Sequence, residues 1–177
     1  FNPKDFDANK IASSAKEAGM KYIVITTKHH EGFCLWDSKY TNFDVASTPF
    51  KGRDILVELS AACKKYGLRF GTYYSIIDWH HSSQQRNNTG GDFWTQWGQV
   101  QMKADKRSEY IKYMKNQIKE LIENYDSDIL WFDGDWVEWW NNDVGTDLYN
   151  YIRELKPDII INNRVAKRES FKKDFGT

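Results

Sequence analysis

Apolar and polar positions along the chain form blocks whose spacing switches between that of strands and that of helices. Short runs rich in β-branched and aromatic residues predict four strands, at residues 21–26, 68–75, 128–133 and 158–164. Apolar positions at helical spacing predict helices at residues 8–18, 53–67, 105–124 and 148–155. The polar stretch from 80 to 103 predicts a long loop, with a turn of helix around Trp94 and Trp97.

This alternation of helix and strand predicts parallel strands joined by right-handed crossovers. Both an open doubly wound α/β sheet and part of a (β/α)8 TIM-type barrel fit the pattern. A complete barrel takes about 250 residues, so a chain of 177 residues supplies about half of one, in a single domain spanning 1–177. No glycine-rich phosphate loop follows any predicted strand, which argues against a nucleotide-binding fold.

The composition narrows the class of partner. With 25 basic and 25 acidic residues, the chain has no electrostatic case for binding nucleic acid, and no apolar run is long enough to span a membrane. Its two cysteines form neither a disulfide framework nor a zinc-type cluster. The aromatic content is unusually high, with eight Trp, ten Tyr and ten Phe. Several of these lie beside carboxylates and amides, as a sugar site requires, because a pyranose has an apolar face and a rim of hydroxyls.

Polar and ionisable side chains follow each predicted strand at its carboxyl end, where parallel α/β folds place their sites. These groups are Lys28 to Glu31, Tyr73 to Ser75, Trp131 to Trp136 and Asn162 to Arg164. Such convergence at one edge of a sheet is rare in a purely structural domain. It is the strongest indication within the sequence that the chain is an enzyme.

Asp133 is a candidate carboxylate nucleophile. Side chains alternate along a strand, so Trp131 and Asp133 share one face, and an aspartate that ends an apolar strand beside a tryptophan suits covalent catalysis. A turn or capping aspartate is an equally good interpretation, because Asp-Gly favours turns. Asp135 is a possible second carboxylate, but it lies beyond Gly134 and its direction does not follow from the sequence.

The histidine pair His29-His30 allows two interpretations. If the strand continued, adjacent histidines would point to opposite sides and would suit a single metal ion poorly, and His80 and His81 lie in a loop without fixed geometry. Neutral imidazoles that exchange hydrogen bonds with sugar hydroxyls fit better. Arg164 stays charged and could orient a carboxylate, or form a surface salt bridge.

Several segments together resemble the catalytic domain of the α-L-fucosidase family of glycoside hydrolases. They are KYIVITTKHHEGFCLWDSKYTNFDV, GRDILVEL, YGLRFGTYYSIIDW and DILWFDGDW. The resemblance runs over the whole chain and is weakest in the 80–103 stretch. It implies a retaining exo-hydrolase that removes terminal α-L-fucose from fucosylated oligosaccharides or glycoconjugates, with no metal or organic cofactor.

The resemblance also implies roles for individual residues. Asp133 matches the family's nucleophile, and the histidines that contact fucose hydroxyls match His29 and His30. The remaining substrate-binding positions fall on Tyr73, Trp131 and Arg164. A secreted, periplasmic or lysosomal location is the family expectation, and the sequence does not indicate an oligomeric state.

The chain departs from the family at both ends. The barrel strands that open the family's fold do not precede Phe1, and the family's acid/base residue often follows a segment similar to DFGT (174–177). The acid/base is therefore expected just past Thr177, with Glu169 as a poorer substitute, and this chain alone is expected to show little or no turnover. The alternatives are a fucose-binding module without turnover, and a metal-dependent barrel hydrolase that uses His29, His80 or His81 with Asp133.

Overall fold

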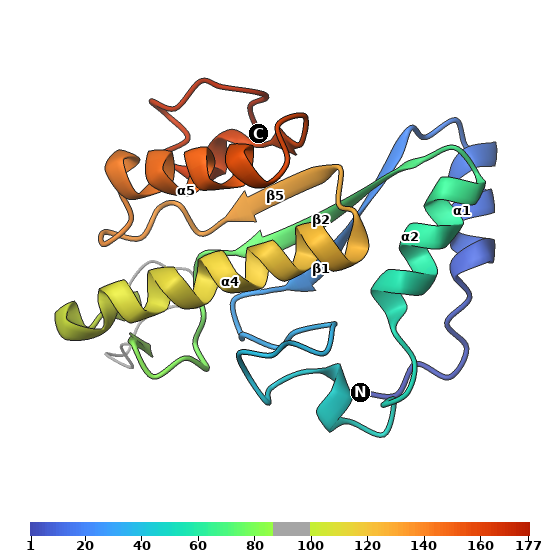
Figure 1. Ribbon diagram of the computed structural model, residues 1–177, viewed down its shortest axis with the longest axis horizontal. Coiled ribbons are helices and arrows are strands. Elements are labelled where there is room, and N and C mark those ends of the chain that lie inside the picture. Colours follow the sequence, from blue (N-terminus) through green and yellow to red (C-terminus); the bar gives the residue numbers. More distant parts are fainter. Residues whose placement is uncertain (87–99) are drawn as a thin grey trace, which may run out of the picture.

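The computed structural model describes residues 1–86 and 100–177, and its centre is a parallel four-stranded sheet (Figure 1). The strands are β1 (Tyr22–Lys28), β2 (Arg69–Ser75), β5 (Ile129–Asp133) and β6 (Ile160–Ile161), in the order β1-β2-β5-β6. This order follows the chain without reversal, so right-handed crossovers place every connection on the same face. That is the geometry of part of a (β/α)8 barrel and not of a doubly wound sheet, so the predicted barrel fragment is confirmed over the doubly wound alternative.

Four helices cover the outer face of the sheet: α1 (Ala8–Glu17), α2 (Ile55–Lys65), α4 (Arg107–Tyr125) and α5 (Asn142–Leu155). They pack in chain order, α1 on α2, α2 on α4 and α4 on α5. Side-chain caps fix where three of them begin, because the carboxylates of Asp7 and Asp54 and the amide of Asn141 accept backbone N–H bonds from the first turn. All four helices confirm the predicted ones to within a few residues, except that α5 begins six residues earlier than the predicted 148.

The core lies between the sheet and the helix layer. Outward-facing strand residues such as Tyr74, Leu130 and Phe132 are fully buried there. The inner face is open, with Tyr22 half exposed, and Ile129, Trp131 and Phe175 help to line a hollow of 710 Å³ on it. This hollow lies toward the amino ends of the strands, away from the edge that carries Asp133.

The predicted long loop at 80–103 is partly regular. Within its described part, β3 (Gln84–Arg86) and β4 (Val100–Met102) form an antiparallel pair. The expected helical turn around Trp94 and Trp97 lies outside the described residues. Three short 3-10 turns complete the elements of residues 1–86 and 100–177: η1 (Val45–Ser47), η2 (Ala104–Lys106) and η3 (Asn163–Val165).

The prediction of a seven-residue fourth strand was wrong, since β6 contains only Ile160 and Ile161. The side chain of Asn162 replaces the next step of the backbone ladder. Its Oδ1 accepts from the Phe132 N–H at 2.7 Å and its Nδ2 donates to the Phe132 carbonyl at 3.0 Å. The backbone is then free to turn into η3, which carries Arg164.

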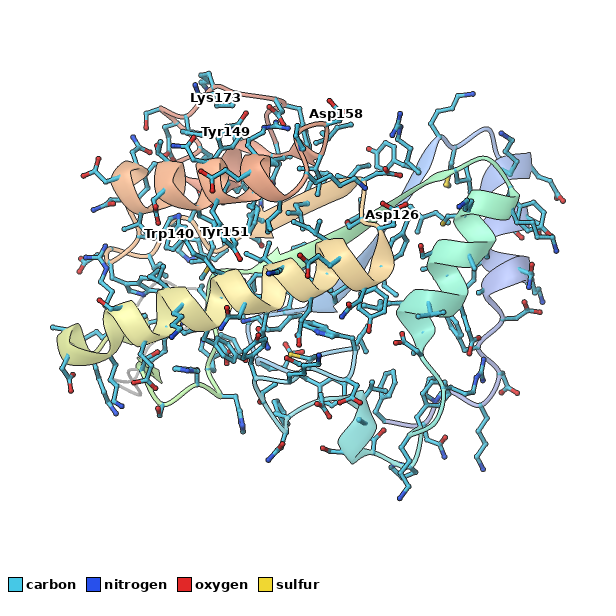
Figure 2. All side chains as sticks on the ribbon, in the orientation of Figure 1. Asp126, Trp140, Tyr149, Tyr151, Asp158 and Lys173 are labelled. Carbon is cyan, nitrogen blue, oxygen red and sulfur yellow. The ribbon has the colours of Figure 1, made fainter. Side chains whose placement is uncertain are left out.

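Helix α5 packs between α4 and the C-terminal segment. Tyr151 projects from α5 toward α4, where Lys115 Nζ lies 5.0 Å from its ring centroid, and Tyr149 projects toward the C-terminal segment (Figure 2). The Tyr149 hydroxyl donates to Asp174 at 3.0 Å, and the Phe175 carbonyl accepts from the N–H of Asn163 at 2.9 Å. The last residues therefore return to the carboxyl end of β6.

Gly145 in α5 is a test of this packing. Helix propensity alone favours Gly145→Ala by about 1 kcal/mol, but an added Cβ would lie 2.6 Å from the Ala166 Cα and the Val165 carbonyl. We expect the variant to lose about 1–3 kcal/mol of unfolding free energy, measured by urea denaturation. Thr146→Ala, at the next and exposed position, is the control and should change stability by less than about 0.5 kcal/mol; equal stability of both variants would contradict the tight α5–η3 contact.

Candidate active site

Asp133 ends β5 with its carboxylate held from two sides. The Tyr73 hydroxyl donates to Oδ2 at 3.0 Å, and Arg164 Nη1 donates to Oδ1 at 2.5 Å. Burial, and next the negative charge of Asp133, raise the pKa of Tyr73 well above its ordinary value, so the phenol keeps its proton and donates. With its side chain 15% exposed, Asp133 is oriented and still reachable from the inner face.

Arg164 links Asp133 to the end of the sequence. Its Nε donates to Thr177 Oγ1 at 2.7 Å while Nη1 binds the carboxylate. Thr177 is itself fixed, because its N–H donates to Asn163 Oδ1 at 3.1 Å. The interpretation of Arg164 as a surface salt bridge does not fit this geometry, because its partner is the carboxylate at the strand end.

Asp135 has a different environment. Its side chain is 2% exposed and is bound by the Arg168 guanidinium, with Nε 2.9 and 3.1 Å from the two oxygens. The Arg168 N–H adds a further bond at 3.1 Å. Asp135 thus anchors the segment after β6, and its partner Arg168 also lies 3.7 Å from Asp133 Oδ1.

The two histidines would point to opposite sides only if the strand continued through them, and it does not. Strand β1 ends at Lys28, and the rings of His29 and His30 lie side by side with centroids 4.2 Å apart. The His29 ring is nearly parallel to that of Tyr73 at 5.7 Å, and its Nδ1 is 3.4 Å from Glu31. His29 is thereby placed on the same face as Tyr73 and Asp133.

His30 is fully buried, and its neighbours define its tautomer. Its Nδ1 lies 2.5 Å from Ser75 Oγ, and the Ser75 hydroxyl gives its only proton to the Ile77 carbonyl at 2.7 Å. Nδ1 must therefore carry the imidazole proton, which makes Nε2 an acceptor. Burial, and next the charge of His29, lower the pKa of His30 to about 4, so the ring is neutral at pH 7.

The other histidines lie on the loop after β2. His80 stacks on Phe43 at 4.2 Å, and His81 Nδ1 lies 2.7 Å from Ser83 Oγ. Across residues 1–86 and 100–177, no group of three His, Cys, Asp or Glu side chains is arranged to hold a metal ion. No observation therefore favours the metal-dependent alternative.

The comparison with known proteins is decisive for the family. Residues 1–177 match the family described as Alpha-L-fucosidase. The chain belongs to the α-L-fucosidase family. It is 31% identical over 168 residues to the alpha-L-fucosidase of Dictyostelium discoideum. The aligned region covers 93% of this chain and 34% of that protein. The chain thus spans about a third of the length of the curated relatives it matches.

Solved fucosidase structures share the fold. An alpha-L-fucosidase of Bacteroides thetaiotaomicron, solved as a trapped covalent intermediate, is 37% identical and has a TM-score of 0.78, over 99% of this chain and 38% of that one. The Lactobacillus casei enzyme in complex with its alpha-L-fucose product is also 37% identical, with a TM-score of 0.77 over 94% of this chain and 54% of that one. Both confirm that these four strands are part of a fucosidase barrel.

Three residues of the candidate site have no individual role predicted from the sequence. Ser75 orients His30, and Arg168 lies near Asp133. Trp136, 39% exposed, has the His30 ring at 5.6 Å and the Arg168 guanidinium at 5.5 Å. Ser75 and Trp136 belong to the polar and aromatic groups at the ends of predicted strands, but the sequence assigns neither a role. Nothing in the sequence around Arg168 distinguishes it from a surface residue.

Proposed function

We propose that the protein containing this chain is a retaining exo-α-L-fucosidase in which Asp133 is the nucleophile. The observation that carries the proposal is the carboxylate at the end of β5, held by Tyr73 and Arg164 and open to the inner face. A covalent intermediate is the hallmark of retention, and the Bacteroides thetaiotaomicron relative was trapped as one with 2-fluoro-fucosyl fluoride. One solved relative holds a fucosyl-GlcNAc disaccharide, which supports a fucosylated glycan as the substrate here.

In this mechanism an Asp133 oxygen forms an ester bond to the anomeric carbon as the glycosidic bond breaks. Tyr73 and Arg164 each occupy one lone pair of the carboxylate and fix the direction of the remaining ones. The more exposed His29 contacts one sugar hydroxyl. The ring of neutral His30 is fully buried in the free chain, so its Nε2 accepts from a second hydroxyl only when sugar binding uncovers it. Trp131, on the Asp133 face of β5, covers the apolar side of the sugar.

The second carboxylic acid is proposed to follow Thr177 in a longer chain. A retaining site needs its two carboxyl groups about 5–5.5 Å apart. Thr177 hydrogen-bonds the same arginine that binds Asp133, so residues after it start beside the nucleophile. Glu169 is exposed and fits this role less well.

The organisation of the protein is proposed on the same basis. Residues 1–177 form one part of a barrel domain, completed by strands outside this chain. No described helix is long and apolar enough to cross a membrane. Relatives named for plasma and tissue support a secreted or lysosomal location.

The test uses a substrate that does not need the missing acid. Fluoride leaves without protonation, so 2-fluoro-fucosyl fluoride should esterify Asp133 in the 177-residue chain even where turnover is negligible. Intact-mass spectrometry should show one added 2-fluorofucosyl unit, and peptide mapping should place it on Asp133. Fucose binding by calorimetry without any label would instead support the alternative, a binding module, and a label on another residue would refute the assignment.

A further inference from the structure

Lys28 and Asp78 form an ion pair that the proposed chemistry does not use. Lys28 Nζ lies 3.0 Å from Asp78 Oδ2, with the two side chains 0% and 1% exposed. The ring of Tyr74 is 4.3 Å from the ammonium, and the rings of Tyr113 and Tyr110 are 5.7 and 5.9 Å away. Burying two charges costs several kcal/mol per ion, and apolar replacements of such pairs are often neutral. Stability alone therefore does not explain the pair, and the best-attested use of such pairs is to fix a register.

A bulge at Thr27 decides which way Lys28 points. Thr26 pairs with Tyr73 and Lys28 with the next residue, Tyr74, so β1 has one residue more than β2 at this point. Without the bulge, alternation would put Lys28 on the inner face with Thr26. With it, Lys28 joins Tyr74 in the core and His29 falls on the inner face, where its ring lies along that of Tyr73.

Asp78 contacts both the loop after β2 and the turn that carries His29 and His30. Its Oδ1 accepts from the N–H groups of His80 and His81 at 3.0 and 2.9 Å. Gly32 closes the turn, with its N–H bonded to the His29 carbonyl and a φ of +87°. It packs so closely on the Asp78 carboxylate that any Cβ there would overlap it.

The loop after β2 also holds the turn directly. The N–H of Trp79, the residue after Asp78, donates to the His30 carbonyl at 2.8 Å. Burial raises the pKa of Asp78, but the charge and hydrogen bond of Lys28 together with the His81 N–H outweigh it, so the net direction is downward and the carboxylate is charged at neutral pH. One charged pair thus contacts the end of β1, the histidine turn and the loop after β2.

We propose that Lys28 and Asp78 are positioning residues. They hold the Thr27 bulge in the register that places His29 and His30 for the sugar. The ammonium draws the last residue of β1 into the core, and the carboxylate forms the base of the turn that follows. This inference rests on the proposed function for the ligand it names, L-fucose.

The test separates positioning from stability with Lys28→Met, Asp78→Asn and the double variant of the 177-residue chain. Each single change leaves one buried charge uncompensated and should lower the urea midpoint markedly, whereas the double variant should recover most of that loss. Its dissociation constant for L-fucose, measured by calorimetry, should nevertheless rise at least about tenfold, the effect of 1.4 kcal/mol. The imidazole resonances of His29 and His30 should shift too, and with only four histidines in the chain these can be assigned by single substitutions.

A purely structural role predicts that the double variant recovers both stability and binding, and that result, with unshifted imidazoles, would overturn the proposal. Lys156→Met with Asp126→Asn, an ion pair of 2.7 Å at the opposite edge of the sheet, is the control and should leave fucose affinity unchanged. Gly32→Ala keeps both charged side chains but places a Cβ against the Asp78 carboxylate, so the turn must move relative to the pair. It should weaken binding similarly and decides the matter if the double variant does not fold. If the unmodified chain does not bind L-fucose, the imidazole spectra alone judge the positioning, and the proposed function is judged separately by the labelling of Asp133.

Discussion

Asp133→Asn is expected to abolish covalent labelling by 2-fluoro-fucosyl fluoride, with a fall in rate on the order of 10⁴-fold or more. The asparagine amide is nearly the same size as the carboxylate but has no anionic oxygen to form the ester. Arg164 would keep donating to the amide oxygen, and the amide NH2 would donate to the Tyr73 hydroxyl oxygen, so both residues can keep their positions around it. The measurement is the rate of mass increase by intact-mass spectrometry.

Asp135→Asn is the matched control two residues away. Asp135 binds Arg168 and not the proposed substrate position, so this variant should lose stability but still be labelled. A urea midpoint for each variant ensures that an unlabelled protein is also a folded one. Labelling of folded Asp133→Asn, or loss of labelling only in folded Asp135→Asn, would move the nucleophile to another carboxylate.

Much of the fold followed from the sequence because each level of the pattern agreed with the next. The apolar runs and the alternation of helix with strand both indicated parallel strands with helices between them. The clustering of Asp133 and Tyr73 followed as well, because carboxyl ends of neighbouring parallel strands lie at one edge. Their partnership with Arg164 required one more step, the turn of η3, which the sequence did not indicate.

The failures have a common physical origin in irregular backbone. The histidine pair would have alternated had the strand continued, but β1 ends at Lys28, and the Thr27 bulge and the turn closed by Gly32 bring both rings together. The fourth strand was expected to be long, but the amide of Asn162 takes over the hydrogen bonds of the ladder. Such features depend on tertiary partners, here Asp78 and Phe132, which no local propensity encodes. They occur at the strand ends, where the candidate site is also located.

A last expectation concerns pH and the buried imidazole of His30. Its pKa falls from 6.5 to about 4 in the folded chain, chiefly because burial disfavours the charged ring, with His29 and Lys28 adding to the effect and Asp133 opposing it. Because the unfolded chain takes up a proton at higher pH than the folded chain, His30 contributes its full share of stability above about pH 6.5. That share is lost as the pH falls toward 4 and amounts to about 3 kcal/mol.

The comparison of the native chain with His30→Gln isolates this effect, because carboxylates and His81 titrate equally in both. Glutamine can keep the bond to Ser75 but has no proton to gain between pH 7 and 4. Urea denaturation should therefore show the native chain losing about 3 kcal/mol more than the variant over this range. Parallel pH curves would mean that folding does not lower the pKa of His30, so that burial would not be what keeps the ring neutral and its Nε2 an acceptor. The pH dependence thus tests, without any substrate, the protonation state on which the role proposed for His30 depends.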